Sequence, residues 1–206
     1  MRVFLLARLS SRLGDHCRYA ASGLLMKKHL LNFILVVVVI GIALAVRTKF
    51  ERFTIPQNGM FPTLAAGSTH WVTKNHSESA SEFSVGDIAV FERVHAGKTY
   101  NFVWRVMAMP GDDVFIEFDE IRINGIPLGR EFVRDDGDME IYSETNGQRT
   151  YEVAYDIAAP IDDKIGCNLT VPNGHLFLLG DNRYNALDSR YHGTVPIEVV
   201  FGKLNP

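Results

Sequence analysis

Three short segments hold the residue types that could form an active site: "IPQNGMFPTL" (55–64), "VWRVMAMPGD" (103–112) and "GDNRYNALDSRYHG" (180–193). The third supplies carboxylates, guanidinium groups and a serine, which can hold charge or position a reacting group. The first is an extended, proline-bracketed stretch with Gly59 near its centre. Glycine has no nucleophilic group, so the centre of this stretch offers no attacking side chain.

Nucleophilic candidates elsewhere lack a complete set of partners. Ser68 and His70 lie two residues apart in a predicted strand and therefore share a face, which makes a contact between them geometrically possible. No acid that would orient the imidazole is in view, so we interpret this pair as ordinary polar surface. Asp188 and Ser189 have no base between them, and this pattern is typical of a turn hydrogen bond.

The charge distribution argues against nucleic acid as a partner. Residues 1–29 carry six Lys/Arg against one acidic residue, whereas the rest of the chain carries 15 basic and 23 acidic residues. A nucleic-acid-binding protein needs a basic face on its folded part, and here the larger part is acidic. The two cysteines, Cys17 and Cys167, are too few for a metal cluster, so we expect neither a metal site nor a cofactor.

The apolar segment 30–46, "LLNFILVVVVIGIALAV", predicts a transmembrane helix. Its 17 residues are at the short end of the roughly 17–25 that span a bilayer, and flanking basic residues can extend its reach. The alternative is a cleaved signal peptide, for which Ala43-Leu44-Ala45 fits the small-x-small pattern. We favour a retained anchor because the lead of 29 residues is longer than the start of an ordinary signal peptide.

The positive-inside rule predicts the orientation of this anchor. The basic lead, residues 1–29, is expected in the cytoplasm and residues 50–206 outside it. The prediction is a single-pass protein of the inner (cytoplasmic) membrane with a periplasmic C-terminal domain. Cys17 and Cys167 then lie on opposite sides of the membrane and do not pair within one chain. The sequence leaves the oligomeric state open.

Beyond residue 50 the chain predicts a mainly β, antiparallel domain, with no amphipathic helix outside the anchor. Short runs rich in β-branched and aromatic residues alternate with turn formers. Residues 113–125 predict a hairpin with its turn at Asp119-Glu120, and residues 140–155 predict a second with an Asn146-Gly147 type I′ turn. The segment at about 128–165 is expected to project as a lesser subdomain, and 74–83 to form an exposed loop. Further strands are expected at 69–73, 87–94, 101–109, 174–180 and 198–204.

These motifs occur in the order found in bacterial signal peptidase I, and the chain resembles that family. The similar segments are "IPQNGMFPTL", "GDIAVF" (86–91), "RVMAMPGD" (105–112), "INGIPL" (123–128), "VPNGHLFLLGDNRYNALDSRYHGTVP" (171–196) and a closing "GK". Each motif is weak alone, but together they cover nearly all of residues 53–203 in the family's order. The resemblance implies a membrane-anchored serine endopeptidase whose β-rich outer domain cuts signal peptides after small residues.

The resemblance also implies that the catalytic groups are missing. The family's serine nucleophile precedes the Met of its SMxPTL motif, and that place is Gly59 here. Its general base, a lysine before the RV…PGD segment, corresponds to Trp104, and the serine that orients this lysine corresponds to Ala186. A serine that helps to bind the oxyanion in many members corresponds to Gln57. Glycine cannot attack, and indole cannot accept a proton near neutral pH, so the Ser-Lys dyad is absent.

Two hypotheses follow for the function. We predict a catalytically inactive signal peptidase I-like protein that serves protein secretion as a peptide-binding, accessory or assembly factor at the membrane. The alternative is an active endopeptidase that cleaves signal peptides with a non-standard residue. Trp104 is expected to fill core volume and also to plug the slot of the lysine stem.

The expected ligand is an extended, signal-peptide-like segment or a strand of a secreted or surface partner. It would bind along the backbone edge of residues 53–60, which needs no catalytic side chain. The expected binding residues are Pro56, Gln57, Asn58, Met60 and Phe61, with Met60 and Phe61 as apolar contacts. The residues expected to support the site are Arg105, Asp181, Asn182, Asp188, Ser189 and Arg190, with a charge-assisted Asp188–Arg190 pair.

Overall fold

The computed structural model describes residues 27–74, 80–95, 97–159 and 166–204. Most of the expected basic lead, Cys17 and residues 75–79 of the expected exposed loop lie outside the described residues. Residues 80–82 of that loop form a short 3-10 helix, η2 (Ala80–Glu82). The chain divides into two units, with the boundary between Thr48 and Lys49, and each is described by itself.

The described residues of the first unit form a helix, Lys27–Lys49, which ends on the first residue of the second unit and extends the predicted segment 30–46 at both ends. It has 23 residues, and its most apolar stretch is not buried within the structure. At 1.5 Å per residue the helix is about 35 Å long, which suffices for a hydrocarbon core of about 30 Å. Its length and composition therefore fit a membrane span.

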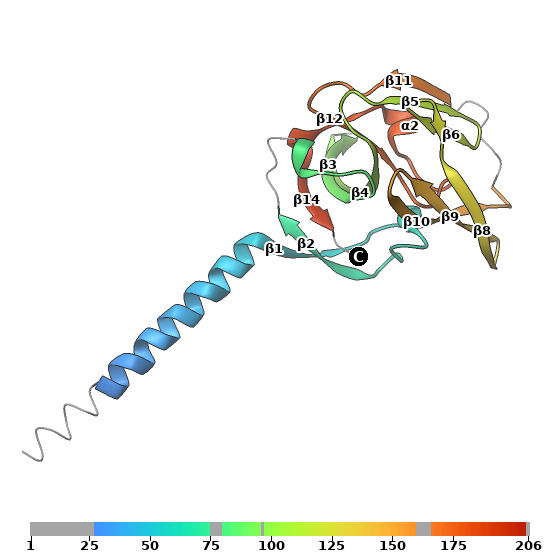
Figure 1. Cartoon of the computed structure of the whole chain (residues 1–206). Helices are drawn as coiled ribbons and strands as arrows, with labels where there is room; N and C mark the ends of the chain where they lie inside the picture. The colour runs from blue at the N-terminus through green and yellow to red at the C-terminus, as the bar shows by residue number, and fades with distance from the viewer. Residues whose placement is uncertain (1–26, 75–79, 96, 160–165, 205–206) are drawn as a thin grey trace, which may run out of the picture. The chain divides into compact units, whose positions relative to one another are not determined.

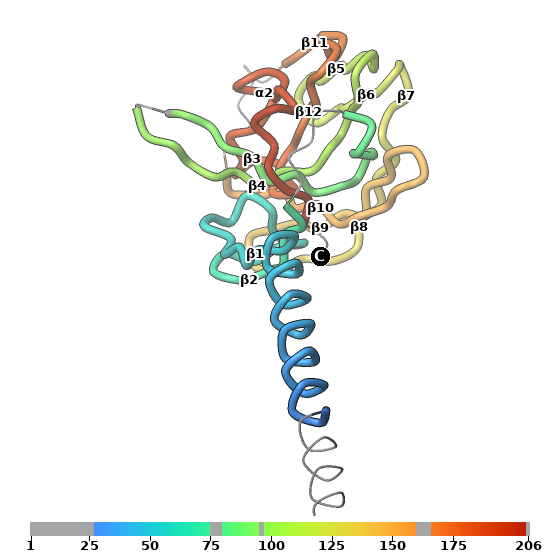
Figure 2. The backbone as a smooth tube through the Cα atoms, turned by 90° about the vertical axis from the view of Figure 1, so that its left-hand side faces the viewer, coloured from blue at the N-terminus to red at the C-terminus, as the bar shows by residue number. Residues whose placement is uncertain are grey.

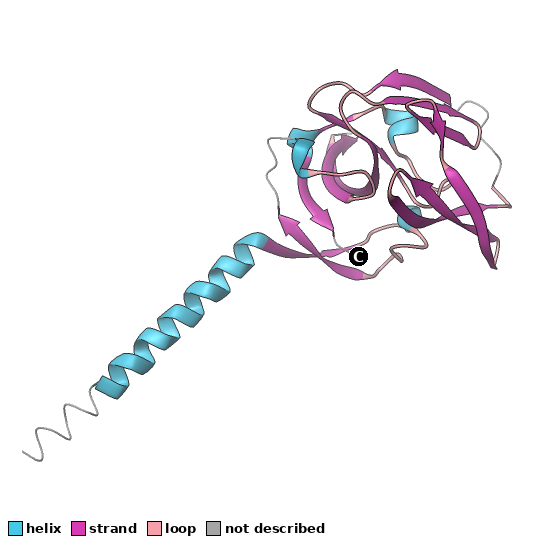
Figure 3. Ribbon diagram, in the orientation of Figure 1, coloured by secondary structure: helices cyan, strands magenta, loops and turns pink. Residues whose placement is uncertain are grey.

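The second unit consists mainly of strands joined by short turns, as Figure 3 shows, which confirms the predicted mainly β, antiparallel fold. Its helices are short: η1 (Asn58–Met60), η2, α2 (Ser189–His192) and η3 (Ile197–Val199). The strands are β1 (Phe50–Thr54), β2 (Thr69–Lys74), β3 (Ile88–His95), β4 (Lys98–Ala108), β5 (Asp113–Glu117), β6 (Glu120–Ile123), β7 (Ile126–Pro127), β8 (Gly129–Asp136), β9 (Met139–Asn146), β10 (Arg149–Asp156), β11 (Gly166–Thr170), β12 (His175–Leu179), β13 (Val195–Pro196) and β14 (Val200–Leu204).

The described strands form three sheets. The largest has seven strands in the order β1-β2-β14-β3-β4-β12-β13, and the others have the orders β11-β5-β6-β7 and β10-β9-β8. The segment expected to form a lesser subdomain thus has a sheet of its own, β8 to β10, beside the β5–β6 region (Figure 1). The β3–β4 hairpin extends out from the rest of the unit as a two-stranded ribbon (Figure 2).

The apolar run of β12 lies between two hydrophobic cores. Leu176 and Leu178 belong to the larger core, which also contains Met60 and Trp104. Phe177 and Leu179 belong to the smaller core under β5 and β6. Successive side chains of a strand point to opposite faces, so a strand covered on both faces is apolar at every position. This explains why "LFLL" in β12 lacks the alternation of buried and exposed residues that β6 shows.

Both predicted turns lie one residue from the observed ones. Glu117 pairs with Glu120, so the first turn is Phe118-Asp119 and not Asp119-Glu120. Asn146 pairs with Arg149, so the second turn is Gly147-Gln148. Asn146 is still part of β9 and is buried, and its amide donates a hydrogen bond of 2.9 Å to the Met107 carbonyl. The Asn-Gly signal was misleading because this tertiary contact holds the asparagine in the strand.

Candidate functional site

Gly59 and Trp104, far apart in sequence, are in direct contact. Gly59 lies in η1, and Trp104 lies in β4. A Cβ atom on Gly59 would lie 2.5 Å from both Cη2 and Cζ3 of Trp104, well inside the usual carbon contact of about 3.5–4.0 Å. The indole, only 2% exposed, therefore occupies the space that a side chain at position 59 would need. The two positions that the resemblance assigns to a nucleophile and a base therefore lie side by side and form an apolar contact.

Gly180 and Ala186 lie beside the same contact. A Cβ atom on Gly180 would lie 2.6 Å from the Gly59 carbonyl oxygen and 3.0 Å from Cζ3 of Trp104, and it would also overlap the Cβ of Ala186. Position 180 therefore has no room for a side chain. Ala186 is itself 5% exposed and belongs to the larger core. Three of the smallest residues thus surround one of the largest.

Little empty space remains beside this contact. A hollow of about 10 Å³ lies against Gly59 and Trp104, which holds one water molecule at most. Its other lining residues are Ile55, Pro56, Gln57, Met60 and Val103. A substrate carbonyl, a nucleophile and a base could not fit into this volume together.

Asn182 holds the turn that contains Gly59. Its backbone N–H donates to the Gly59 carbonyl at 3.1 Å, and its side-chain Nδ2 donates to the Asn58 carbonyl at 3.3 Å. Asn182 is fully buried, and its Oδ1 has no hydrogen-bond partner among the described residues. Both hydrogen bonds from Asn182 go to backbone carbonyls. They therefore hold the turn independently of which side chain occupies position 59.

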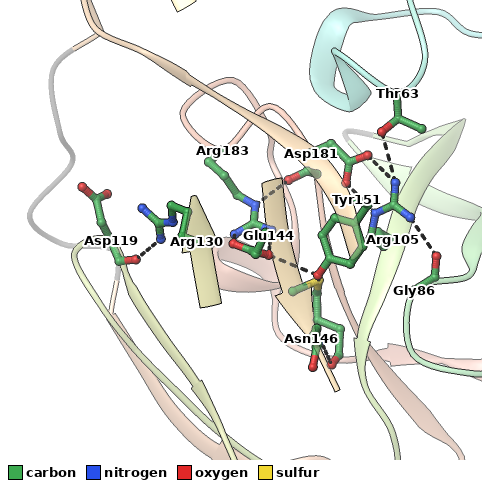
Figure 4. A network of polar contacts seen from close by, with 12 residues as sticks. Thr63, Gly86, Arg105, Asp119, Arg130, Glu144, Asn146, Tyr151, Asp181 and Arg183 are labelled. Carbon is green, nitrogen blue, oxygen red and sulfur yellow. Dashed lines mark hydrogen bonds and ion pairs between the residues drawn. The ribbon is translucent and has the colours of Figure 1, made fainter. Parts of the chain in front are cut away.

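Next to this apolar contact, Arg105 forms a buried bidentate ion pair with Asp181 (Figure 4). Nε donates to Oδ1 at 2.8 Å and Nη2 to Oδ2 at 2.6 Å. The same guanidinium group donates to the Gly86 carbonyl at 2.8 Å and to Oγ1 of Thr63 at 3.1 Å. Its carbon lies 4.1 Å from the centre of the Tyr151 ring, in a cation–π contact. Arg105 therefore connects β4, β10, the segment after η1 and the loop after β12.

A second buried pair, Arg183–Glu144, connects the same loop to β9 (Figure 4). Nη1 of Arg183 donates to Oε2 of Glu144 at 2.8 Å, and its Nε donates to the Gly180 carbonyl at 3.1 Å. Burial acts to lower the pKa of the Arg183 guanidinium, but the Glu144 carboxylate outweighs it, so the pKa lies above its usual value. Tyr151 donates to Oε1 of Glu144 at 3.1 Å, and burial raises the pKa of this hydroxyl. The Arg183 guanidinium is therefore held charged, and the Tyr151 hydroxyl neutral.

Asp188 and Arg190 form the expected ion pair at the start of α2. Nε of Arg190 donates to Oδ1 of Asp188 at 2.9 Å and Nη2 to Oδ2 at 2.8 Å. Asp188 also accepts the backbone N–H of Gly180 at 3.0 Å and that of Arg190 at 3.1 Å, as the N-cap of α2. Ser189 accepts the backbone N–H of Leu178 at 3.0 Å. The hydroxyl of Ser189 is therefore used to fix the loop against β12.

Ser68 and His70 are in contact, as their spacing allows. Oγ of Ser68 lies 2.9 Å from Nε2 of His70, and it also donates to the Ala65 carbonyl at 2.5 Å. A hydroxyl has one proton, so with that proton on the Ala65 carbonyl the oxygen accepts from the imidazole. In this arrangement His70 does not act as the base for Ser68.

The expected binding residues differ in exposure. Pro56, Gln57 and Asn58 are exposed, and Phe61 is half-buried. Met60 is only 1% exposed and packs in the larger core. Its side chain therefore contributes to stability and offers no surface to a peptide, contrary to its expected role as an apolar contact. A charged residue at position 60 would disrupt the core.

The structure adds Glu144 and Tyr151 to the residues that support the site. Glu144 lies in the polar run "SETN" of β9, which predicts exposure rather than burial, and Tyr151 is half-buried in β10. Their roles depend on the packing of β9 and β10 against the loop after β12. Nothing in the local sequence indicates that packing.

No group of three or more His, Cys, Asp or Glu side chains that could hold a metal ion occurs within the described ranges. Cys167 is half-buried in β11, and burial raises the pKa of its thiol to about 11. The thiolate is the reactive form, so this group is a weak nucleophile at neutral pH.

The fold and the adjoining motifs define the class of protein. The sequence profile of the family described as "Signal peptidase, peptidase S26" matches residues 27–206. Signal peptidase I of Bacillus caldolyticus is 29% identical over 158 residues, 76% of this chain and 78% of that protein. Signal peptidase I of Pseudomonas fluorescens is 30% identical over 179 residues, which cover 74% of this chain and 62% of that protein.

Two further proteins are similar to this chain. Signal peptidase IB of Staphylococcus aureus is 28% identical and covers 87% of this chain and 90% of its own length. A crystal structure of a signal peptidase I from Enterococcus faecalis shares 26% identity over 60% of this chain and 97% of that one, with a TM-score of 0.37. The chain belongs to the signal peptidase family, peptidase S26.

Proposed function

We propose that this protein is a membrane-anchored signal peptidase homologue that does not cleave peptides. The observation that carries the proposal is the contact between Gly59 and Trp104, whose indole lies where a catalytic side chain would stand. Loss of one member of a catalytic unit already removes most of the rate, and Gly59, Trp104 and Ala186 together leave no nucleophile, no base and no group to orient the base.

We further propose that the domain binds extended peptides beside β4. The Val106 N–H donates to the Asp87 carbonyl at 2.8 Å, and bonded and non-bonded pairs alternate along an antiparallel ladder. Trp104, two residues before Val106 and opposite Ala89, is therefore in a bonded pair, whereas Val103 and Asn101 (opposite Glu92) are in non-bonded pairs. The backbone N–H and C=O groups of Asn101 and Val103 thus point away from β3. On that side, the described pairing of β12 with β4 covers only Arg105 to Ala108.

The opposite wall of this proposed cleft is the segment after β1. The Ile55 N–H bonds to the Ser68 carbonyl, and the Ile55 carbonyl accepts from Gly67, both at 2.9 Å, which fixes the segment. Exposed Pro56 and Gln57 follow, and they share the hollow at Trp104 with Val103 of β4. An added strand between these walls would be held by backbone hydrogen bonds, which need no catalytic residue.

The helix Lys27–Lys49 would keep this cleft at a membrane surface. The basic lead supports an orientation with the β domain outside the cytoplasm, in the inner membrane. In that place the protein would act on secretion or surface assembly as an accessory or chaperone-like factor, with signal peptides or a strand of a secreted partner as ligand. Protease added to spheroplasts should then degrade residues 50–206; protection would overturn the orientation.

Cleavage tests the first proposal. The detergent-solubilised full-length protein, incubated with a preprotein that carries an Ala-x-Ala site, should give no product above background, while an active family member cleaves it. Gly59→Ser alone should stay inactive, because no base is present. Gly59→Ser combined with Trp104→Lys and Ala186→Ser restores the three groups and should give measurable cleavage. Cleavage by the unmodified protein that Ser68→Ala abolishes would favour the alternative of a non-standard nucleophile.

A binding titration tests the second proposal, that extended peptides bind beside β4. A fluorescently labelled signal peptide is titrated against wild type, Asn101→Pro and Asn101→Ala. Proline removes the outward-pointing N–H and can be tolerated where it faces away from the neighbouring strand, whereas alanine keeps the N–H. Loss of one backbone bond predicts an affinity about two- to tenfold lower for Asn101→Pro. Wild-type affinity for Asn101→Ala completes the expectation. Equal affinities for all three, or no binding, would discard this cleft.

A further inference from the structure

We infer that the peptide cleft does not select small side chains, because Trp104 fills the hollow that a bound side chain would enter. The inference rests on the proposed peptide binding and specifies the class of ligand. A strand beside Asn101 and Val103 would turn alternate side chains towards the domain. The hollow on that side of the cleft is the one at Gly59, whose floor is the indole.

The indole is held in this place by its surroundings. Gly59 and Gly180 lack the Cβ atoms that would overlap the ring, and Ala186 lies directly behind Gly180. Phe102 packs against the indole with ring centres 6.0 Å apart. Any rotation of the ring into solvent would leave a large apolar cavity at the edge of the core, at a cost that increases with cavity volume. Trp104 is therefore a fixed part of the cleft and not a lid.

The remaining space limits what can bind. A hollow of about 10 Å³ is at the lower limit for one water molecule, and a methyl group is larger than water. A bound segment must therefore rest its side chain on the indole or direct it outwards, whether that side chain is alanine or leucine. The ligands are then extended apolar segments in general, recognised through their backbone, and an Ala-x-Ala sequence has no advantage over a bulkier one.

Two labelled peptides test this inference. They are identical except for Ala-x-Ala in one and Leu-x-Leu in the other, and both are titrated against the full-length protein in detergent. Wild type should bind them within about twofold of each other. Trp104→Ala removes the floor, so leucine can enter an apolar pocket and the leucine peptide should gain at least about tenfold over the alanine peptide. Trp71→Ala is the matched control, because Trp71 is 60% exposed on β2, and it should behave as wild type.

Trp104→Phe and an indole-binding measurement cover the case in which Trp104→Ala folds poorly. Phenylalanine keeps most of the core and should give a smaller preference of the same sign. Free indole should raise the melting temperature of Trp104→Ala but not of wild type, because only the variant has an empty site of that shape.

The outcomes distinguish failure of the proposed peptide binding from failure of this inference. Absence of binding of either peptide to wild type would overturn the proposed peptide binding, and this inference with it. Binding of both with a wild-type preference of more than about fivefold for Ala-x-Ala would overturn this inference alone. An unchanged ratio in both Trp104 variants would also overturn it, because the indole would then not form the floor of the pocket.

Discussion

Two adjoining parts of the β domain contain opposite kinds of contact. Around Gly59 the contact is between carbon atoms, with an indole against glycine. Around the loop that follows β12, three buried ion pairs join Arg105 to Asp181, Arg183 to Glu144 and Arg190 to Asp188. All six side chains are at most 6% exposed. The positions that the family resemblance matches to catalytic groups are apolar here, and the three ion pairs around them are buried.

Energetics explain this difference. A catalytic serine and lysine contribute chemistry, and a buried lysine is costly to desolvate, so their replacement by an apolar contact need not destabilise the fold. A buried ion pair is different, because removal of one partner leaves an unpaired charge in the interior. Arg105, Arg183 and Arg190 are therefore retained as long as the fold is, whether or not the protein is an enzyme. Their presence supports no claim of catalysis.

The largest effect should come from the polar part. Glu144→Gln keeps the shape of the side chain but leaves the Arg183 charge unpaired, which should lower the free energy of unfolding by about 3–5 kcal/mol. Glu152→Gln is the control, because Glu152 pairs with Arg134 at the surface, where both side chains are more than 40% exposed, and should cost less than about 1 kcal/mol. Urea unfolding of the full-length protein in detergent measures both. Similar small losses would mean that the buried pair is not structurally important.

The apolar part should give a smaller effect. Gly59→Ser places a Cβ against the indole and should cost about 1–3 kcal/mol of unfolding free energy through overpacking. Gly129→Ser is the control, since a Cβ there would meet only Thr145 at 3.7 Å, an ordinary contact, and should be nearly neutral.

A double-mutant cycle links that cost to the indole. In a Trp104→Ala background, which itself should lose about 3–5 kcal/mol, Gly59→Ser should cost less than it does alone. An additive cycle would mean that the two residues are not coupled and that another contact limits position 59.

The sequence predicted those features that depend on local pattern. Runs rich in β-branched and aromatic residues located β2 to β6, β9, β10, β12 and β14, whereas no strand was predicted at β1, β7, β8, β11 or β13. Hydropathy located the helix Lys27–Lys49 within three residues at each end. The contact between positions 59 and 104 was expected only through the family resemblance, because the two residues are remote in the chain.

Features set by tertiary packing were not predictable. The Asn146-Gly147 signal favoured a turn, but the buried bond from Asn146 to Met107 shifts the turn by one residue. Met60 follows the exposed residues 56–58, yet η1 turns its side chain into the larger core. Glu144 and Arg183 are 39 positions apart, and either one alone is typical of a solvated surface.

The smallest effect should come from the contact between Ser68 and His70. Ser68→Ala removes the bond to Ala65 and the contact with His70, both partly exposed, and should cost about 0.5–1.5 kcal/mol of unfolding free energy. If chemistry had moved from Gly59 to this pair, the same change would abolish cleavage. We expect instead that Ser68→Ala, added to the Gly59→Ser, Trp104→Lys and Ala186→Ser variant, leaves the recovered cleavage rate within about twofold, because the Ser68 proton is directed to a carbonyl and not to the imidazole. The rate of product formation from the Ala-x-Ala preprotein decides between the two, and His70→Ala should behave in the same way. A loss of activity in both variants, without a matching loss of stability, would place the reactive group at Ser68. The polar residues around Gly59 would then not be purely structural.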